Sequence, residues 1–131
     1  MINNRIRLIS TFTLIILDIL WIYFFMGNRY IILIKNIQNS SAEFKYEYAI
    51  IAYILMILGL NLFVLPLINI DNITLCDCFS KAFLFGVILY GVYNFTNASI
   101  FNNWDMNIAI YDMLWGGTVY FLSCYILKFI Y

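Results

Sequence analysis

The residues most able to perform chemistry in this sequence are two aspartates, Asp18 and Asp112. The string Asp-x-Leu-Trp occurs twice, at Asp18 to Trp21 and at Asp112 to Trp115, and both copies lie inside long apolar segments. An ionised side chain near the bilayer centre costs at least about 2.5 kcal/mol, so such residues usually face the interior of a helical bundle and mark a functional site. A carboxylate in that position can bind a polar ligand, relay a proton or act as a general acid or base.

A second set of polar side chains lies in the third apolar segment. Residues three and four apart share one face of a helix, which groups Tyr90, Tyr93, Asn94 and Asn97 on one side. The same rule places each Asp beside the Trp three positions later. Amides and hydroxyls within membrane helices need hydrogen-bond partners, so we expect these faces to turn toward one another.

The elements that position these residues are four membrane spans. The chain of 131 residues is 65% hydrophobic and 11% charged, which lies outside the usual range for soluble domains. Crossing a hydrocarbon core of about 30 Å takes roughly 20 helical residues, and uninterrupted Ile, Leu and Phe runs exclude a β-barrel. The sequence predicts an all-α integral membrane bundle of four transmembrane helices in a single domain over residues 1–131. The predicted spans are residues 8–26, 48–68, 79–97 and 108–126.

The distribution of basic residues predicts the orientation. Four of them lie at the end of the bundle that carries both termini: Arg5, Arg7, Lys81 and Lys128. Three lie at the opposite end, all in the first loop: Arg29, Lys35 and Lys45. The last loop, residues 98–107, has no Lys or Arg, so the count favours cytoplasmic termini. The first apolar segment lacks a small-residue cleavage site, and we interpret it as a retained helix.

With that orientation, Asn94, Asn97 and Asp112 fall in the outer half of the bundle and Asp18 falls just past its middle. We therefore predict a water-accessible polar pocket, walled by Trp and Tyr, that binds a small polar or lipid-like ligand or relays a proton. Its predicted residues are Asp18, Trp21, Tyr93, Asn94, Asn97, Asp112 and Trp115. In the alternative, each Asp is a buried acid that hydrogen-bonds to Asn, Tyr or Trp only to hold the helices together, at about 0.6 kcal/mol per contact.

Local features refine the predicted bundle. Glycines in the last two spans would let these helices approach closely: Gly86, Gly91, Gly116 and Gly117. We expect the apolar stretch from Tyr30 to Ile37 to lie along the membrane interface as a short separate helix. Pro66 marks the end of the second span. Trp104 and Tyr111, near the last loop, are typical of an interfacial aromatic belt, and the tyrosines outside the predicted site are expected to serve packing.

Several functional classes lack support in the sequence. Seven basic and seven acidic residues give zero net charge without a basic stripe, so we expect no nucleic-acid partner. Histidine is absent, and Cys76, Cys78 and Cys124 cannot complete an ordinary four-ligand zinc site, so we expect no metal and no cofactor. No phosphate-binding loop, zinc-protease or hydrolase motif occurs, which favours a protein that is not an enzyme.

The order of these elements resembles a group of small predicted membrane proteins, the domain-of-unknown-function 2177 family. The resemblance is carried by Asp18, Trp21, the stretch from Tyr93 to Ser99, Trp104 and the stretch from Asp112 to Gly116. The family signature usually reads Tyr-Asp-x-Thr-Asn, whereas this chain has Asn94, and the proline that often follows the loop tryptophan is replaced by Asp105. The resemblance covers nearly the whole chain. It implies a four-span membrane protein and supplies no activity.

Three hypotheses follow. The leading one is an integral membrane protein whose intramembrane polar site binds or moves a small or lipid-like ligand. The second is a membrane-embedded lipid-modifying enzyme with Asp18 or Asp112 as general acid or base. The third is a structural or assembly subunit whose polar groups serve helix packing. The expected partner in each case is the lipid bilayer, and the sequence leaves open a homo-oligomer or a partner membrane protein.

Overall fold

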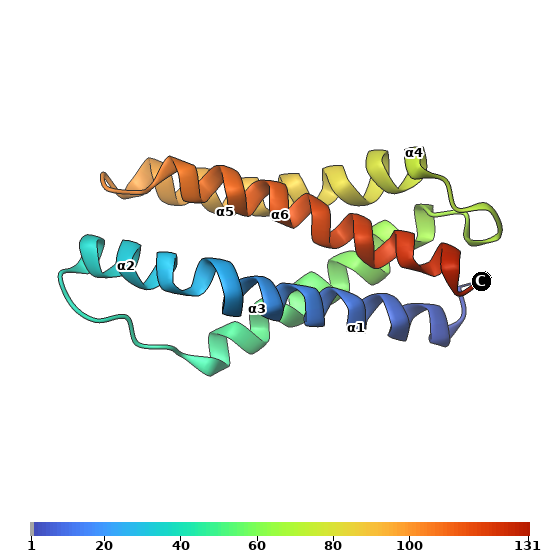
Figure 1. Cartoon of the computed structure of the whole chain (residues 1–131), viewed down its shortest axis with the longest axis horizontal. Helices are drawn as coiled ribbons and strands as arrows, with labels where there is room; N and C mark the ends of the chain where they lie inside the picture. Colours follow the sequence, from blue (N-terminus) through green and yellow to red (C-terminus); the bar gives the residue numbers. More distant parts are fainter. Residues whose placement is uncertain (1) are drawn as a thin grey trace.

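The chain folds into an elongated bundle of helices (Figure 1). The computed structural model describes residues 2–131, and this part of the chain contains helices and loops but no β-strand. Its helices form four segments, three of which include a π-helical turn, and one further 3₁₀ turn, Ile70–Asn72, lies in the loop between the second and third segments. In chain order these are α1 (Asn4–Trp21) and α2 (Gly27–Gln38), joined by the π-helical turn Ile22–Met26; α3 (Tyr46–Gly59), continued by the π-helical turn Leu60–Val64 and the 3₁₀ turn Leu65–Leu67; α4 (Leu75–Asp77) and α5 (Leu84–Ile100), joined by the π-helical turn Cys78–Phe83; and α6 (Met106–Tyr125), continued by the 3₁₀ turn Ile126–Phe129.

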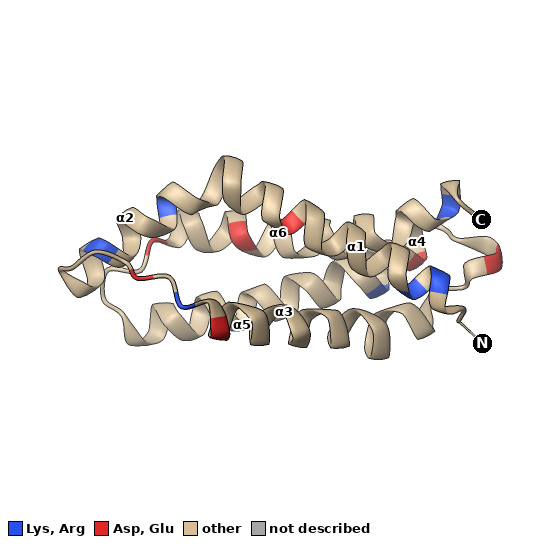
Figure 2. Cartoon of the chain, turned by 90° about the horizontal axis from the view of Figure 1, so that it is seen from below, with Lys and Arg blue, Asp and Glu red and all other residues tan. Residues whose placement is uncertain are grey.

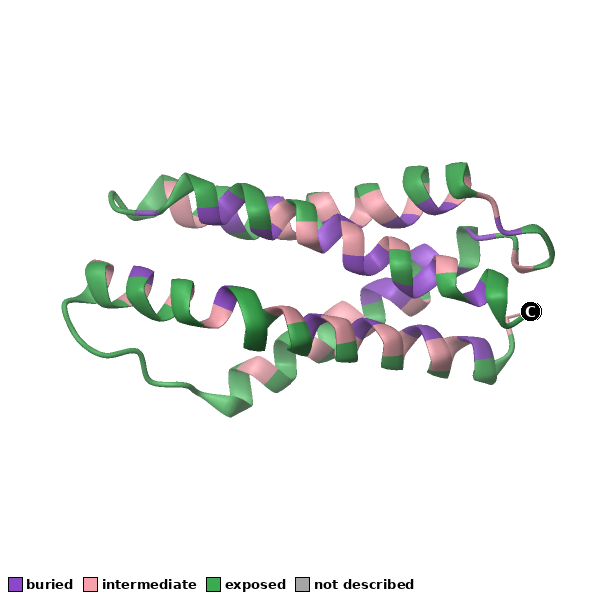
Figure 3. Ribbon diagram, in the orientation of Figure 1, coloured by how far each residue is buried: buried purple, intermediate pink, exposed green. Residues whose placement is uncertain are grey.

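The predicted class, an all-α membrane bundle of four helices, is confirmed. Three of the segments are long and apolar enough to cross a membrane: Asn4–Gln38, Tyr46–Leu67 and Leu75–Ile100. The fourth, α6, runs antiparallel to α5 and packs along it, so it lies within the same layer of lipid (Figure 1). Large apolar side chains such as Phe12, Phe24 and Phe63 are exposed, as a surface that contacts lipid requires. Exposed positions occur along every helical segment (Figure 3).

The first helical segment is much longer than the predicted span. It contains 35 residues, which correspond to a length of roughly 52 Å at 1.5 Å per residue, against about 30 Å for the hydrocarbon core. The prediction of a separate interfacial helix from Tyr30 to Ile37 is therefore wrong, because these residues continue the first helix through a π-helical turn. The segment ends at Asn39, whose positive φ of 55° is the left-handed conformation that often terminates helices.

The closest helix contact joins α5 to α6 and depends on glycine. A methyl group on Gly86 would lie 2.0 Å from the carbonyl oxygen of Gly116, and one on Gly117 would lie 2.6 Å from the ring of Phe83. The predicted close approach of these two helices is thus confirmed at Gly86, Gly116 and Gly117. Gly91 instead faces the flexible side chain of Met113.

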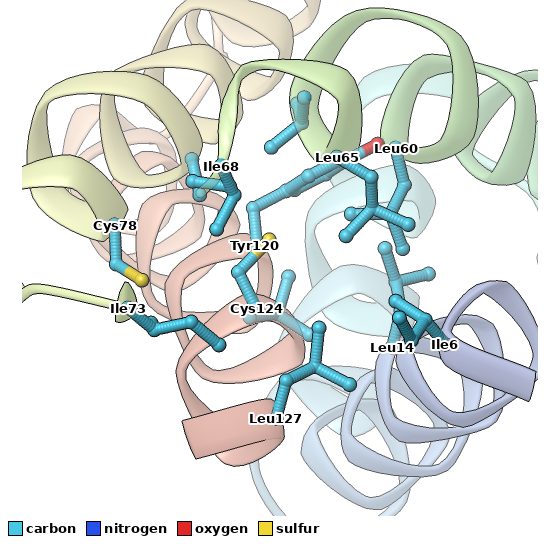
Figure 4. Close-up of a cluster of buried hydrophobic side chains, with 13 residues drawn as sticks. Ile6, Leu14, Leu60, Leu65, Ile68, Ile73, Cys78, Tyr120, Cys124 and Leu127 are labelled. Carbon is cyan, nitrogen blue, oxygen red and sulfur yellow. The ribbon is translucent and has the colours of Figure 1, made fainter. Parts of the chain in front are cut away.

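Both termini lie at one end of the bundle, which we call the terminal end; the opposite end is the far end (Figures 1 and 2). Lys and Arg gather toward these two ends. The larger hydrophobic core, shown in Figure 4, fills the terminal end around Leu14, Leu60 and Tyr120. A smaller cluster, the far-end core, consists of Met26, Leu33, Trp104, Ile108 and Ala109.

The middle of the bundle is where the candidate site lies. The start of α3 diverges from the other helices, and the backbone of α2 runs apart from those of α5 and α6 (Figure 1), while Leu33 of α2 packs into the far-end core.

Candidate functional site

Asp18 joins all four helical segments. Its side chain is 5% exposed, and it accepts hydrogen bonds from the Tyr53 hydroxyl at 2.8 Å, the Tyr90 hydroxyl at 3.0 Å and the Trp115 indole N–H at 3.0 Å. These donors lie on α3, α5 and α6, whereas Asp18 lies on α1. Three donors engage both oxygens of this buried side chain, so neither oxygen is left without a partner.

Asp112 has fewer partners than Asp18. It is 7% exposed and accepts one hydrogen bond, of 2.7 Å, from the side-chain amide of Asn94, which is itself fully buried. The same Asn94 nitrogen donates to the backbone oxygen of Tyr90 at 3.0 Å. The Tyr30 hydroxyl of α2 lies beside the Asp112 carboxylate as a second, weaker partner. Tyr90 therefore connects the two acids, through its hydroxyl to Asp18 and through its backbone and Asn94 to Asp112.

The two tryptophans of the Asp-x-Leu-Trp strings contact each other. The rings of Trp21 and Trp115 stack at 4.5 Å with an angle of 4° between their planes, and Trp21 also stacks on Phe25 at 4.5 Å. The two indole N–H groups differ in their hydrogen bonding. The Trp115 N–H donates to Asp18, whereas the Trp21 N–H is buried and has no partner among residues 2–131. The two strings are thus alike in sequence and unlike in hydrogen bonding.

Five buried side-chain atoms have no hydrogen-bond partner among residues 2–131: Ser10 Oγ, Trp21 Nε1, Asn61 Oδ1, Asn94 Oδ1 and Trp104 Nε1. One of them, Asn94 Oδ1, belongs to the residue that donates to Asp112. Leaving a buried polar group without a hydrogen bond costs about 1–3 kcal/mol, so such atoms are good candidates for contact with a ligand. Asn94 Oδ1 is therefore an unpaired acceptor on the residue that donates to Asp112.

A groove of about 470 Å³ opens at the far end, between α2 and the start of α6. Its lining residues come from α2, the loop before α6 and the first turns of α6: Arg29, Ile32, Leu33, Asn36, Asn103, Asp105, Asn107, Ile108 and Tyr111. Leu33 and Ile108 also belong to the far-end core, so the apolar floor of the groove is continuous with it. Ile108 lies four residues before Asp112 on α6 and shares its helix face, which places the groove about one turn from the carboxylate.

The cation at the mouth of this groove has no acidic partner. The Arg29 guanidinium lies 4.6 Å from the ring centre of Phe25 and 5.8 Å from that of Tyr111. The ion pair between Lys81 and Asp77 is the only one within residues 2–131. Stacking on aromatic rings fixes the position of the Arg29 charge without neutralising it.

Five of the seven predicted site residues come together: Asp18, Trp21, Asn94, Asp112 and Trp115. Tyr93 does not join them, because its side chain is 52% exposed and lies edge-on to Trp104 with ring centres 6.1 Å apart. Asn97 is partly buried one turn beyond Asn94. Within the described chain, no group of three His, Cys, Asp or Glu side chains could hold a metal ion.

Two expectations for individual aromatic residues are wrong. Trp104 is 8% exposed, so it is part of the far-end core rather than of a belt at the lipid interface. Tyr53 was expected to serve packing, yet it donates to Asp18, as does Tyr90 from the predicted polar face of the third span. Spacing along one helix groups Tyr90 with Asn94, but no spacing rule connects Tyr53 with a residue on another helix.

Comparison with known proteins supports the membrane class. The model of a family described as "Predicted membrane protein (DUF2177)" matches residues 6–127. No curated protein and no solved structure matches the chain.

Proposed function

Because the chain belongs to this family of predicted membrane proteins, the domain-of-unknown-function 2177 family, we propose a role for it within the bilayer: it binds a lipid-like ligand at the far end of its bundle. The observation that carries the proposal is the unequal bonding of two acids in equivalent sequence contexts. Asp18 accepts three hydrogen bonds and Asp112 accepts one. In this proposal Asp18 holds the helices together and Asp112 serves the ligand site.

The contacts of Asp18 support a structural role. Both of its oxygens are engaged by donors from other helices, so a ligand would have to displace Tyr53, Tyr90 or Trp115 to reach them. Displacement would leave a hydroxyl or an indole N–H unpaired inside the bundle, at a cost of about 1–3 kcal/mol. This arrangement favours helix packing over catalysis or ligand binding at Asp18.

The surroundings of Asp112 support a binding role. Asn94 Oδ1 and Trp21 Nε1 are buried and have no partner among the described residues, and the groove begins one helical turn away at Ile108. A volume of about 470 Å³ falls within the range of roughly 300–1,000 Å³ that is typical of small-molecule sites. Asp112 does not itself line the groove, and in this proposal it contacts the part of the ligand that reaches past Ile108 into the bundle.

The lining of the groove favours an amphipathic ligand. Ile32, Leu33 and Ile108 provide apolar contacts, whereas Arg29, Asp105 and several asparagines provide polar ones. Ile32 lines the groove and is exposed, so a molecule that already lies in the bilayer can reach the groove from the side.

Photolabelling tests this proposal. The protein would be reconstituted into phosphatidylcholine vesicles that contain a phosphatidylcholine with a diazirine in its acyl chain, and labelled peptides would be identified by mass spectrometry. We expect strong labelling of α2 and of the start of α6. Ile32→Trp narrows the groove and should reduce this labelling, because Ile32 is exposed and lines the groove.

The matched control is Ile31→Trp, since Ile31 is an exposed neighbour outside the groove lining. This variant should label like the unmodified protein. Uniform labelling of all lipid-facing helices, unchanged by Ile32→Trp, would contradict the proposal and favour a purely structural role for the polar groups.

A further inference from the structure

The groove carries charges of both signs in addition to its apolar floor. Arg29 and Asp105 both line it, and neither forms an ion pair within residues 2–131. Asp105 uses Oδ1 to accept from the backbone N–H groups of Asn107 at 2.8 Å and Ile108 at 3.4 Å, which caps α6. Its other oxygen accepts no hydrogen bond from the described chain. One unneutralised cation and one carboxylate with a free oxygen therefore share a single groove.

The spacing of Arg7 and Arg29 on the first helical segment relates the groove to the thickness of a bilayer. Arg7 and Arg29 belong to one continuous helical segment and lie 22 positions apart, which corresponds to roughly 33 Å along the helix axis. That distance is close to the thickness of the hydrocarbon core, about 30 Å, and Arg side chains tend to mark its boundaries. If Arg7 lies at one boundary, Arg29 lies at the other.

The remaining polar side chains of the groove are free to bind. Asn36, Asn103 and Asn107 line it, and their side-chain amides make no hydrogen bonds within the described residues. Amide oxygens accept from an ammonium group, and amide nitrogens donate to a phosphate. Arg is well suited to phosphate because its guanidinium presents several N–H donors in one plane.

We infer that the ligand is a zwitterionic phospholipid with a primary ammonium group, of the phosphatidylethanolamine type. Its phosphate is bound by Arg29, its ammonium group by Asp105 with help from the asparagine amides, and its glycerol and upper acyl region by Ile32, Leu33 and Ile108. This inference rests on the proposed function and specifies the headgroup that the groove selects. An anionic lipid without an amine would gain the contact with Arg29 but meet the negative charge of Asp105.

Native mass spectrometry of the detergent-solubilised protein can test the headgroup preference. Phosphatidylethanolamine and phosphatidylglycerol with identical acyl chains would be added separately, and the lipid retained by the protein compared. We expect the unmodified protein to retain phosphatidylethanolamine about two- to fivefold more strongly, the range expected of a partly exposed ionic contact.

Two variants separate the proposed contacts. Asp105→Asn should remove the preference for phosphatidylethanolamine while keeping α6 capped, because Asn is as good an N-cap residue as Asp. Arg29→Gln should weaken the retention of both lipids, since both carry a phosphate. Lys35→Gln is the matched control, because Lys35 is an exposed cation on α2 that does not line the groove. Its loss should leave the retention of both lipids unchanged.

The outcomes distinguish the two proposals. Equal retention of the two lipids, or a preference that survives Asp105→Asn, would overturn the headgroup assignment. If either of those results is found while the diazirine lipid still labels the groove, the proposal that the groove binds a lipid-like ligand is retained and only the headgroup preference is rejected. If photolabelling also fails to find the groove, both proposals are wrong.

Discussion

Removing the Asp18 carboxylate should destabilise the bundle far more than removing that of Asp112. Asp18→Ala eliminates three hydrogen bonds, from Tyr53, Tyr90 and Trp115, whereas Asp112→Ala eliminates the single bond from Asn94. Both substitutions truncate the same side chain at a buried position, so the loss of packing volume is similar. The difference between the two variants therefore measures the two additional hydrogen bonds.

The expected magnitudes follow from the number of contacts. Side-chain hydrogen bonds between membrane helices average about 0.6 kcal/mol and reach about 1.7 kcal/mol. Three such bonds correspond to a total of about 2–5 kcal/mol for Asp18, and one bond to about 0.6–1.7 kcal/mol for Asp112. We thus expect Asp18→Ala to lower the free energy of unfolding by about 1–3 kcal/mol more than Asp112→Ala.

Steric trapping or unfolding in sodium dodecyl sulfate, followed by tryptophan fluorescence, measures these free energies. A double-mutant cycle then isolates individual bonds. Tyr53→Phe and Tyr90→Phe should each cost about 0.6–1.7 kcal/mol in the unmodified protein and almost nothing when Asp18 is already alanine. Two results would refute this reasoning: equal costs for the two aspartates, or a Tyr53→Phe cost that is unchanged by the loss of Asp18.

Three further predictions concern packing and orientation. Gly86→Ala should reduce stability by about 1–3 kcal/mol, because the added methyl group would lie 2.0 Å from a backbone oxygen of α6. Gly91→Ala should cost less, because its methyl group meets only a flexible side chain, at 3.1 Å. Thermal unfolding of both variants in detergent would compare the two costs. Trp21→Leu should remove about 0.5–1.5 kcal/mol of ring stacking and reduce the near-ultraviolet circular dichroism, and an unchanged spectrum would argue against the stacked pair. If both termini are cytoplasmic, a membrane-impermeant maleimide should label the Asn103→Cys variant in intact cells, because the last loop then lies outside. The exposed native Cys76 should be labelled only after permeabilisation. The reverse labelling pattern would show that the topology is inverted.

The sequence alone determined the class of the protein and the identity of its critical acids. Apolar segments of about 20 residues must form helices in lipid, because backbone groups find no partners there outside a helix or a closed barrel. The insertion cost of a carboxylate likewise indicates that Asp18 and Asp112 face inward, and both are buried. The close approach of Gly86 to Gly116 was also predictable, since small residues on facing membrane helices commonly permit it.

Only the tertiary structure decided how the two Asp-x-Leu-Trp strings differ. The donors to Asp18 lie 35, 72 and 97 positions away along the chain, on three other helices. Periodicity within one helix specifies which side chains share a face, but it does not specify the rotation, depth and tilt of the partner helices. Those variables place Trp115 against Asp18, leave the Trp21 indole nitrogen unpaired and bury Trp104 in the far-end core. They also let the first helix continue past the membrane boundary, which creates the groove between α2 and α6 that no local pattern in the sequence indicates.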